Sequence, residues 1–137
     1  MAHYLKSGVL SIFITLSAPS LLPAQQLLAE NCSTGALPPG WTNTGLPNNQ
    51  TWSFDNPGAR QIFGVGFDAS FAMLDSDHFG GGQIQDAYLT TPALDASGLA
   101  NVWLVFSESF RSYPNSFHEI LVSPDDGATW ITVRKDF

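Results

Sequence analysis

The chain has 137 residues, of which 44% are hydrophobic and 12% aromatic, and its formal net charge is −7. This length allows one domain and a short additional segment. The acidic balance argues against binding to nucleic acid or to anionic membranes, which needs a basic surface. A single cysteine excludes an internal disulfide.

The N-terminal segment has the pattern of a secretory signal peptide. Lys6 precedes an uncharged apolar run at residues 8–22, and Ala24 offers a small residue at a cleavage position. The run is short for a membrane span, although an anchor or a buried helix would have a similar composition. We therefore predict that residues 1–24 are a signal peptide and that the rest of the chain does not insert into a membrane. Their removal takes away one base and no acid, which changes the net charge from −7 to −8.

Residues 25–137 alternate short extended segments with turn-forming residues, as is typical of all-β domains. Residues 31–57 are rich in Asn, Thr, Gly and Pro, which interrupt helices and mark turns. No window beyond the N-terminal segment has a convincing helical periodicity. The predicted strands lie at residues 61–67, 71–76, 86–91, 101–110, 117–123 and 129–137.

The strand predicted at residues 101–110 is apolar on both faces, with Leu104 on one and Trp103 on the other. Such a strand is expected to be covered on both sides. Two packed antiparallel sheets, a β-sandwich, follow from this pattern, with most tryptophans in the core. Strand-like residues continue to Phe137, where a sandwich would expose an unpaired edge. We therefore predict that the domain is incomplete at its C-terminus.

Residues 123–130 read SPDDGATW, which resembles the Asp-box hairpin of sialidase propellers. In this pattern the Ser and Asp side chains bond to the backbone of their own turn, while the Trp packs under the hairpin. A propeller would need several copies at a regular spacing, and the chain has one. The motif is predicted to be a folding device and not part of a catalytic site.

Three carboxylates, Asp75, Asp77 and Asp86, flank a Gly-rich turn in the segment DSDHFGGGQIQD. Their spacing matches part of an EF-hand loop, but Phe79 stands where an oxygen ligand belongs, and the flanking segments predict strands instead of helices. An EF-hand is therefore rejected. A structural calcium site made of these carboxylates and loop carbonyls remains a hypothesis, with a solvated acidic loop as the alternative.

No catalytic motif surrounds the histidines outside the predicted signal peptide, His78 and His118. Glu108 and Glu119 lie on neighbouring predicted strands, where a carboxylate pair could serve a glycosidase. Without a cleft or a third positioning group, we predict no catalytic residue.

Two single residues carry further expectations. Cys32 is expected to be a small buried hydrophobe, because a free cysteine is among the most buried residue types. Tyr113, in the apparent loop RSYPNSF, is the best exposed aromatic residue for stacking on a sugar.

Three segments stand in a recognisable order and spacing: LPPGW at residues 37–41, DAYLTTPALDASG at 86–98 and LVSPDDGATW at 121–130. Together they resemble the MAM-like jelly-roll domains of the cleaved-adhesin and choice-of-anchor type, which occur in exported bacterial surface proteins. The resemblance implies a calcium-stabilised jelly-roll sandwich, often exported by type IX secretion. The family usually has an acid where Ser33 stands here, which leaves Asp75, Asp77 and Asp86 as the metal positions.

The sequence thus predicts a signal peptide at residues 1–24 and an all-β, jelly-roll-like antiparallel β-sandwich at residues 25–137. The predicted protein is secreted or held at the cell surface. Its predicted function is that of a non-catalytic adhesion or accessory module that recognises a glycan or a matrix or surface protein. The alternative is an ancillary domain of a secreted protease or glycosidase whose catalytic part lies beyond residue 137.

Overall fold

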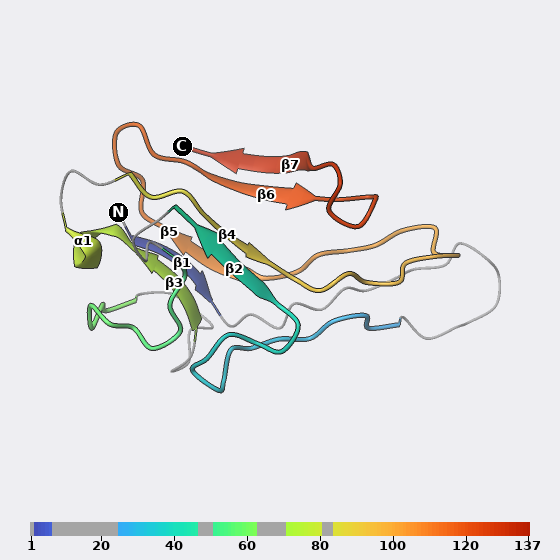
Figure 1. Ribbon diagram of the computed structural model, residues 1–137, viewed down its shortest axis with the longest axis horizontal. Helices are drawn as coiled ribbons and strands as arrows, with labels where there is room; N and C mark the ends of the chain where they lie inside the picture. The colour runs from blue at the N-terminus through green and yellow to red at the C-terminus, as the bar shows by residue number, and fades with distance from the viewer. Residues whose placement is uncertain (1, 7–24, 47–50, 63–70, 81–83) are drawn as a thin grey trace.

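The computed structural model describes residues 2–6, 25–46, 51–62, 71–80 and 84–137. Within these ranges the regular elements are short strands and one single-turn helix (Figure 1). They are β1 (Ala2–Lys6), β2 (Thr42–Gly45), β3 (Phe71–Asp75), α1 (Ser76–Phe79), β4 (Ala87–Thr90), β5 (Ser107–Phe110), β6 (His118–Val122) and β7 (Ile131–Asp136).

The strands form three small sheets, in which every pairing is antiparallel. The first has the order β3-β1-β5, while β2 pairs with β4 and β6 with β7. The β6–β7 hairpin lies along one side of the molecule (Figure 1). The predicted all-β class with antiparallel pairing is confirmed, whereas the jelly-roll sandwich stays a prediction.

The best-buried element is β3, which has every side chain buried. Four of its residues are apolar, and Met73 is fully buried. Ser53 and Met73 exchange two backbone hydrogen bonds of 2.7 Å, so that the segment at residues 51–54 pairs with β3 from outside the first sheet. Cys32 is also buried, as was expected of a free cysteine. Burial of this apolar strand supplies the local core.

Four predicted strands are confirmed with shorter bounds, as β3, β4, β6 and β7. The strand predicted at 101–110 is wrong over its first six residues, because only Ser107–Phe110 is a strand. The apolar side chains at 102–105 are 42–57% exposed. None of the tryptophans is buried, since Trp41 and Trp52 are partly exposed and Trp103 and Trp130 are exposed. An apolar alternating pattern shows that a segment could pack against another layer, but it does not show that such a layer is present. The predicted strand at 101–106 and the predicted burial of the tryptophans were wrong for this reason.

Besides β1, which lies in the predicted signal peptide, two elements were not expected from the sequence. The helix α1 begins where the Asp75 side chain accepts a hydrogen bond from the backbone N–H of His78. The strand β2 is held by Asn43, whose side chain bonds to both the N–H and the C=O of Trp52. Both depend on side chain–backbone bonds that a periodicity search does not detect.

The predicted signal peptide coincides only in part with described residues. Ala2–Lys6 forms β1, and the apolar run at residues 8–22 lies outside the described part of the chain, as does most of the strand predicted at 61–67. Among the described residues, no helix is long and apolar enough to cross a membrane. The signal peptide remains a prediction.

Candidate functional site

The turn at residues 123–130 is built by its own side chains, as its sequence predicts. The Ser123 hydroxyl accepts a 2.7 Å hydrogen bond from the N–H of Gly127 and donates to Asp125. The Asp125 carboxylate accepts from the N–H and the hydroxyl of Thr129 at 2.7 and 2.6 Å. These bonds hold the pKa of Asp125 below its usual value. With its acceptors used inside the turn, Asp125 acts as a folding residue. Trp130 is 48% exposed and does not lie fully under the hairpin.

Asp75 is a fully buried carboxylate that is already paired within the protein. Arg60 donates two hydrogen bonds to it, from Nε at 2.5 Å and from Nη2 at 2.9 Å, and the N–H of His78 donates a third at 3.1 Å. Burial raises the pKa of Asp75, but these donors outweigh burial and the pKa lies below its usual value. A Cβ at Gly58 would clash with the same carboxylate, so glycine permits the close approach of this loop. Asp75 therefore serves as an ion-pair partner and helix cap.

The other two predicted metal ligands do not complete a site with Asp75. The Asp77 side chain is 59% exposed and lies 4.0 Å from Nη2 of Arg60. Asp86 is exposed, and its charge and its hydrogen bond raise the pKa of Tyr88. Among the described residues, these three carboxylates do not gather as a ligand group. As placed, they do not fit a calcium cage, and calcium stays a prediction to be tested.

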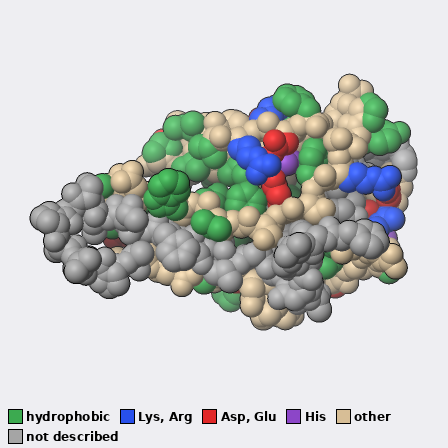
Figure 2. Space-filling model, turned by 180° about the vertical axis from the view of Figure 1, so that it is seen from behind, with side chains coloured by type: hydrophobic (Ala, Val, Ile, Leu, Met, Phe, Trp, Pro, Cys, Tyr) green, Lys and Arg blue, Asp and Glu red, His purple; other side chains and the backbone are tan. Residues whose placement is uncertain are grey.

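A second charged cluster joins β5 to the β6–β7 hairpin. Nε2 of His118 lies 3.1 Å from Oε2 of Glu108 and 3.1 Å from Oδ2 of Asp136. Neither of these two contacts is a hydrogen bond, and both ring nitrogens of His118 are buried without a hydrogen-bond partner. Arg134 contacts the same two acids, Glu108 at 2.5 Å and Asp136 at 2.6 Å. Seen from behind, charged side chains of both signs and a histidine gather among hydrophobic ones (Figure 2).

This cluster has the donor set of a transition-metal site, an imidazole and two carboxylates with ligand atoms within 4.8 Å of one another. The guanidinium of Arg134 already pairs with both carboxylates, however. We therefore interpret the cluster as an ion-pair network that fastens β5 to the hairpin. Sequence reasoning missed Asp136, because a register shift between Ile120 and Leu121 is what places His118 opposite Asp136 in the hairpin.

The carboxylates considered for a glycosidase, Glu108 and Glu119, belong to separate ion pairs. Glu108 binds Arg134, whereas Glu119 lies 3.1 Å from Nζ of Lys135. Each is held by a cation of the hairpin, which leaves neither poised as a free acid or base in a shared cleft.

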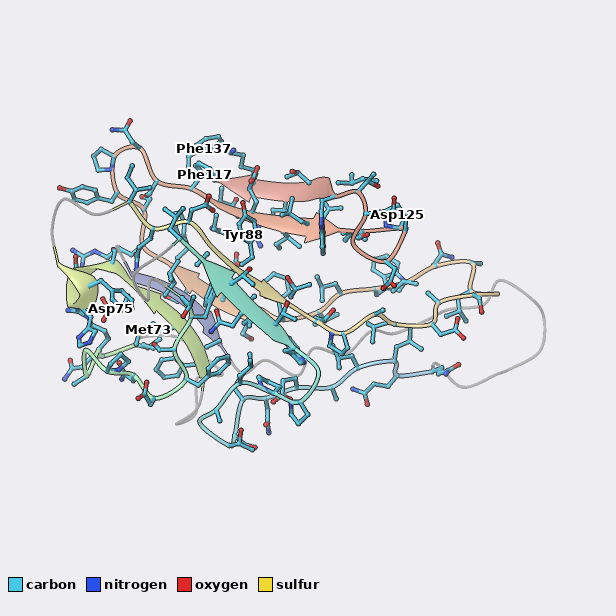
Figure 3. The ribbon with its side chains drawn as sticks, viewed as in Figure 1. Met73, Asp75, Tyr88, Phe117, Asp125 and Phe137 are labelled. Carbon is cyan, nitrogen blue, oxygen red and sulfur yellow. The ribbon has the colours of Figure 1, made fainter. Side chains whose placement is uncertain are left out.

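An open aromatic hollow lies at the end of the hairpin opposite to the turn that contains Asp125 (Figure 3). Its volume is about 690 Å³, and it is lined by Ser112, Tyr113, Pro114, Asn115, Ser116, Phe117 and Phe137. Phe117 and Phe137 are neighbours at the ends of paired strands, with ring centroids 6.4 Å apart. Tyr113 is 70% exposed, Phe117 48% and Phe137 79%. The exposure predicted for Tyr113 is confirmed.

The hollow is held by contacts that fix its rings and its loop. Nζ of Lys135 lies 3.6 Å from the centroid of the Phe117 ring, a cation–π contact that the ion pair with Glu119 supports. Ser116 closes the loop, because its N–H and hydroxyl both donate to the carbonyl of Tyr113 and its Oγ accepts from the N–H of that residue. Asn115 adopts a φ of 68°, which asparagine tolerates in tight turns. The loop is thus a defined turn that presents Tyr113 to solvent.

Cys32 lies apart from these clusters. Burial, and to a smaller extent the nearby charge of Glu30, raises the pKa of its thiol to about 11. The thiol is consequently protonated and unreactive at neutral pH, in keeping with the structural role expected from the sequence.

Comparisons with protein-family models, curated proteins and solved structures find no significant match. The resemblance to MAM-like domains accordingly stays a prediction, and any function must be argued from the geometry above.

Proposed function

We propose that the protein is an exported, non-catalytic binding module that recognises carbohydrate through the aromatic hollow. The observation that supports this proposal most strongly is the exposure of Tyr113 and Phe117 around one concave surface, which Phe137 also lines. Large aromatic side chains normally bury their area, and a group of them left in solvent marks a binding surface. The flat faces of such rings suit the C–H faces of sugar rings.

The rest of the hollow supplies what a sugar needs besides stacking. Its volume lies in the range of small-ligand sites. Ser112, Asn115 and Ser116 bring hydroxyl, amide and backbone groups that can orient sugar hydroxyls. The charged side chain in contact with the rings, Lys135, is paired with Glu119. A neutral glycan therefore suits the hollow better than an acidic or a basic ligand.

The export and the family are supported by the sequence. Residues 1–24 have the composition of a signal peptide, and three segments resemble MAM-like adhesin domains. The antiparallel sheets agree, at a coarser level, with the jelly-roll-like sandwich that this resemblance implies. The module would act at the cell surface or in the medium, as an adhesin or beside a catalytic domain of a secreted protease or glycosidase.

The proposal is tested by screening the purified full chain on an array of neutral oligosaccharides, beside Tyr113→Ala and Tyr88→Ala variants. Tyr88 is a matched control because it is 50% exposed and lies outside the hollow. We expect Tyr113→Ala to weaken binding about tenfold or more, since stacking on an aromatic ring contributes on the order of 1–2 kcal/mol. Tyr88→Ala should bind as the wild type does. No binding by the wild type, or equal loss in both variants, would refute the proposal.

A further inference from the structure

Three side chains from three different strands converge where β5 meets the β6–β7 hairpin. Glu108 lies on β5, His118 on β6 and Asp136 on β7, and each offers a donor atom within 4.8 Å of the other two. His118 and Asp136 are paired across the hairpin, so the backbone register holds them together. Ligands of one zinc ion lie about 2.0–2.2 Å from the metal and hence roughly 3–4 Å from each other. The two separations of 3.1 Å from Nε2 of His118, to Glu108 and to Asp136, fall in this range.

The imidazole of His118 faces two acceptors without a hydrogen bond to either. Both of its ring nitrogens are buried and have no hydrogen-bond partner. Buried polar atoms are nearly always paired in native proteins, and an unpaired one commonly marks a bound water or ion. The ring packs edge-on against Phe110, with centroids 4.5 Å apart, which restricts its rotation. A ring nitrogen this close to two carboxylates needs a proton or a metal cation between them, and neither contact has the geometry of a shared proton.

The charges of the cluster also favour a divalent cation. Glu108 and Asp136 bring two negative charges, and the guanidinium of Arg134 supplies one positive charge. Arg134 has the most exposed side chain of the four residues, at 48%. Oδ2 of Asp136 has no hydrogen-bond partner although Nε of Arg134 lies 2.6 Å away, so this contact is an ion pair without hydrogen-bond geometry. The guanidinium is therefore the member of the cluster that can turn out into solvent.

We propose that Glu108, His118 and Asp136 bind a divalent transition-metal ion of the zinc class, which displaces the guanidinium of Arg134. An imidazole and two carboxylates suit zinc, whereas calcium sites consist of oxygen ligands. The two positive charges of the ion match the two carboxylates. Three protein ligands leave a further position to water.

The position of this site in the fold gives it a structural effect. It ties β5 of the first sheet to the β6–β7 hairpin, at the base of the loop that joins β5 to β6 and lines the aromatic hollow. The site is separate from the calcium site predicted at Asp75, Asp77 and Asp86, in both its residues and its class of metal.

The test is isothermal titration calorimetry of the full chain, stripped of metal with EDTA and dialysed, with zinc chloride as the titrant. We expect saturable uptake of one zinc ion per chain. His118→Gln should weaken uptake about tenfold or more, because it removes the nitrogen ligand, whereas His78→Gln should bind zinc as the wild type does. His78 is a matched control because it is an exposed histidine next to an acid, Asp77. No saturable uptake by the wild type, or equal affinity in the wild type and His118→Gln, would overturn the proposal.

A second variant keeps the test decisive if His118→Gln fails to fold, as judged by circular dichroism. Arg134→Gln removes the competing guanidinium and no ligand, so it should bind zinc several-fold more tightly than the wild type. Equal or weaker binding by Arg134→Gln would overturn the proposal. Equimolar calcium should leave the zinc bound, and its displacement of zinc would overturn the assignment to a transition metal. None of these measurements involves a glycan, so the proposed function holds or fails independently.

Discussion

Replacement of Asp75 by Asn tests whether the acidic segment at residues 75–86 is held by an ion pair or by a cation. Asn keeps the shape of the side chain and remains a good helix N-cap, but it removes the charge. The change leaves the guanidinium of Arg60, whose side chain is 30% exposed, facing a neutral amide. Loss of one partner of a buried pair costs roughly 3–5 kcal/mol, and the partial exposure of Arg60 reduces this to about 2–3 kcal/mol. Asp75→Ala also removes the cap, for about 1 kcal/mol more.

The assay is thermal unfolding followed by circular dichroism. For a chain of this length, 1 kcal/mol changes Tm by about 3–5 °C, so Asp75→Asn should lower Tm by about 10 °C. The matched control is Asp77→Asn. The Asp77 side chain is 59% exposed and lies as far as 4.0 Å from Nη2 of Arg60, so this pair is weak and we expect Tm to change by less than about 2 °C. A Tm for Asp75→Asn within 2 °C of the wild type would refute the reasoning.

The same melts, repeated with calcium and with EDTA, test the calcium prediction. A cation that binds only the folded state raises Tm by linkage. Because Arg60 occupies both oxygens of Asp75, we expect the wild type to melt at the same temperature in both solutions. A Tm several degrees higher in calcium, lost in Asp77→Asn, would restore the cation site predicted from the sequence.

The effect of pH on this pair follows from the direction of its pKa shift. The folded pKa of Asp75 lies below its ordinary value of 3.8, so the pair contributes its full stability above that unfolded pKa. The contribution is lost as the pH falls through the folded pKa. The difference in Tm between wild type and Asp75→Asn should accordingly be constant from pH 5 to 7 and shrink below pH 4.

Two other predictions concern the hairpin and the thiol. Asp125→Asn should speed hydrogen exchange of the Thr129 amide several-fold, because its acceptor loses its charge, whereas Asp126→Asn should not; equal rates in both variants would contradict the role of Asp125 in the turn. Cys32 should react with iodoacetamide at pH 8 at least tenfold more slowly in the native protein than in urea, because the thiol is buried with a pKa of about 11. That pKa is raised, so the stability associated with it is complete below the unfolded pKa of 9.0 and is lost as the pH rises toward 11. Equal alkylation rates in buffer and urea would contradict the burial of Cys32.

The features that could be predicted from the sequence are those set by neighbouring residues. The turn at residues 123–130 is an example, since Ser123, Asp125 and Thr129 lie within one turn and bond to one another. The exposure of Tyr113 followed in the same way from a loop rich in Pro, Asn and Ser. Cys32 needed no partner to be assigned correctly, because burial is the ordinary state of a free cysteine.

The features that could not be predicted depend on which distant segments meet. Arg60 can bind Asp75 because Gly58, which has no side chain, leaves room for the carboxylate beside the loop. Nothing in the local pattern DSDHFGGG identifies an arginine 15 residues earlier as the partner of Asp75. The apolar segment at 101–106 was predicted to be a strand covered on both faces, yet its side chains are largely exposed. The alternating pattern could not show whether another part of the chain packs against it. Asp136 could not be found from the turn alone, since regular pairing from Val122 and Ile131 would place Lys135 opposite His118, and the irregularity between Ile120 and Leu121 brings Asp136 there instead.

The aromatic hollow at residues 112–117 and 137 carries the proposed function, and NMR of the aromatic side chains tests it most directly. A neutral oligosaccharide chosen from the array would be titrated into the full chain while the ring resonances of Tyr113, Phe117 and Phe137 are followed. The account predicts saturable shifts of these three rings and unchanged resonances for Trp130 at the opposite end of the hairpin. Shifts at Trp130 with none in the hollow, or no shift of any ring, would contradict it.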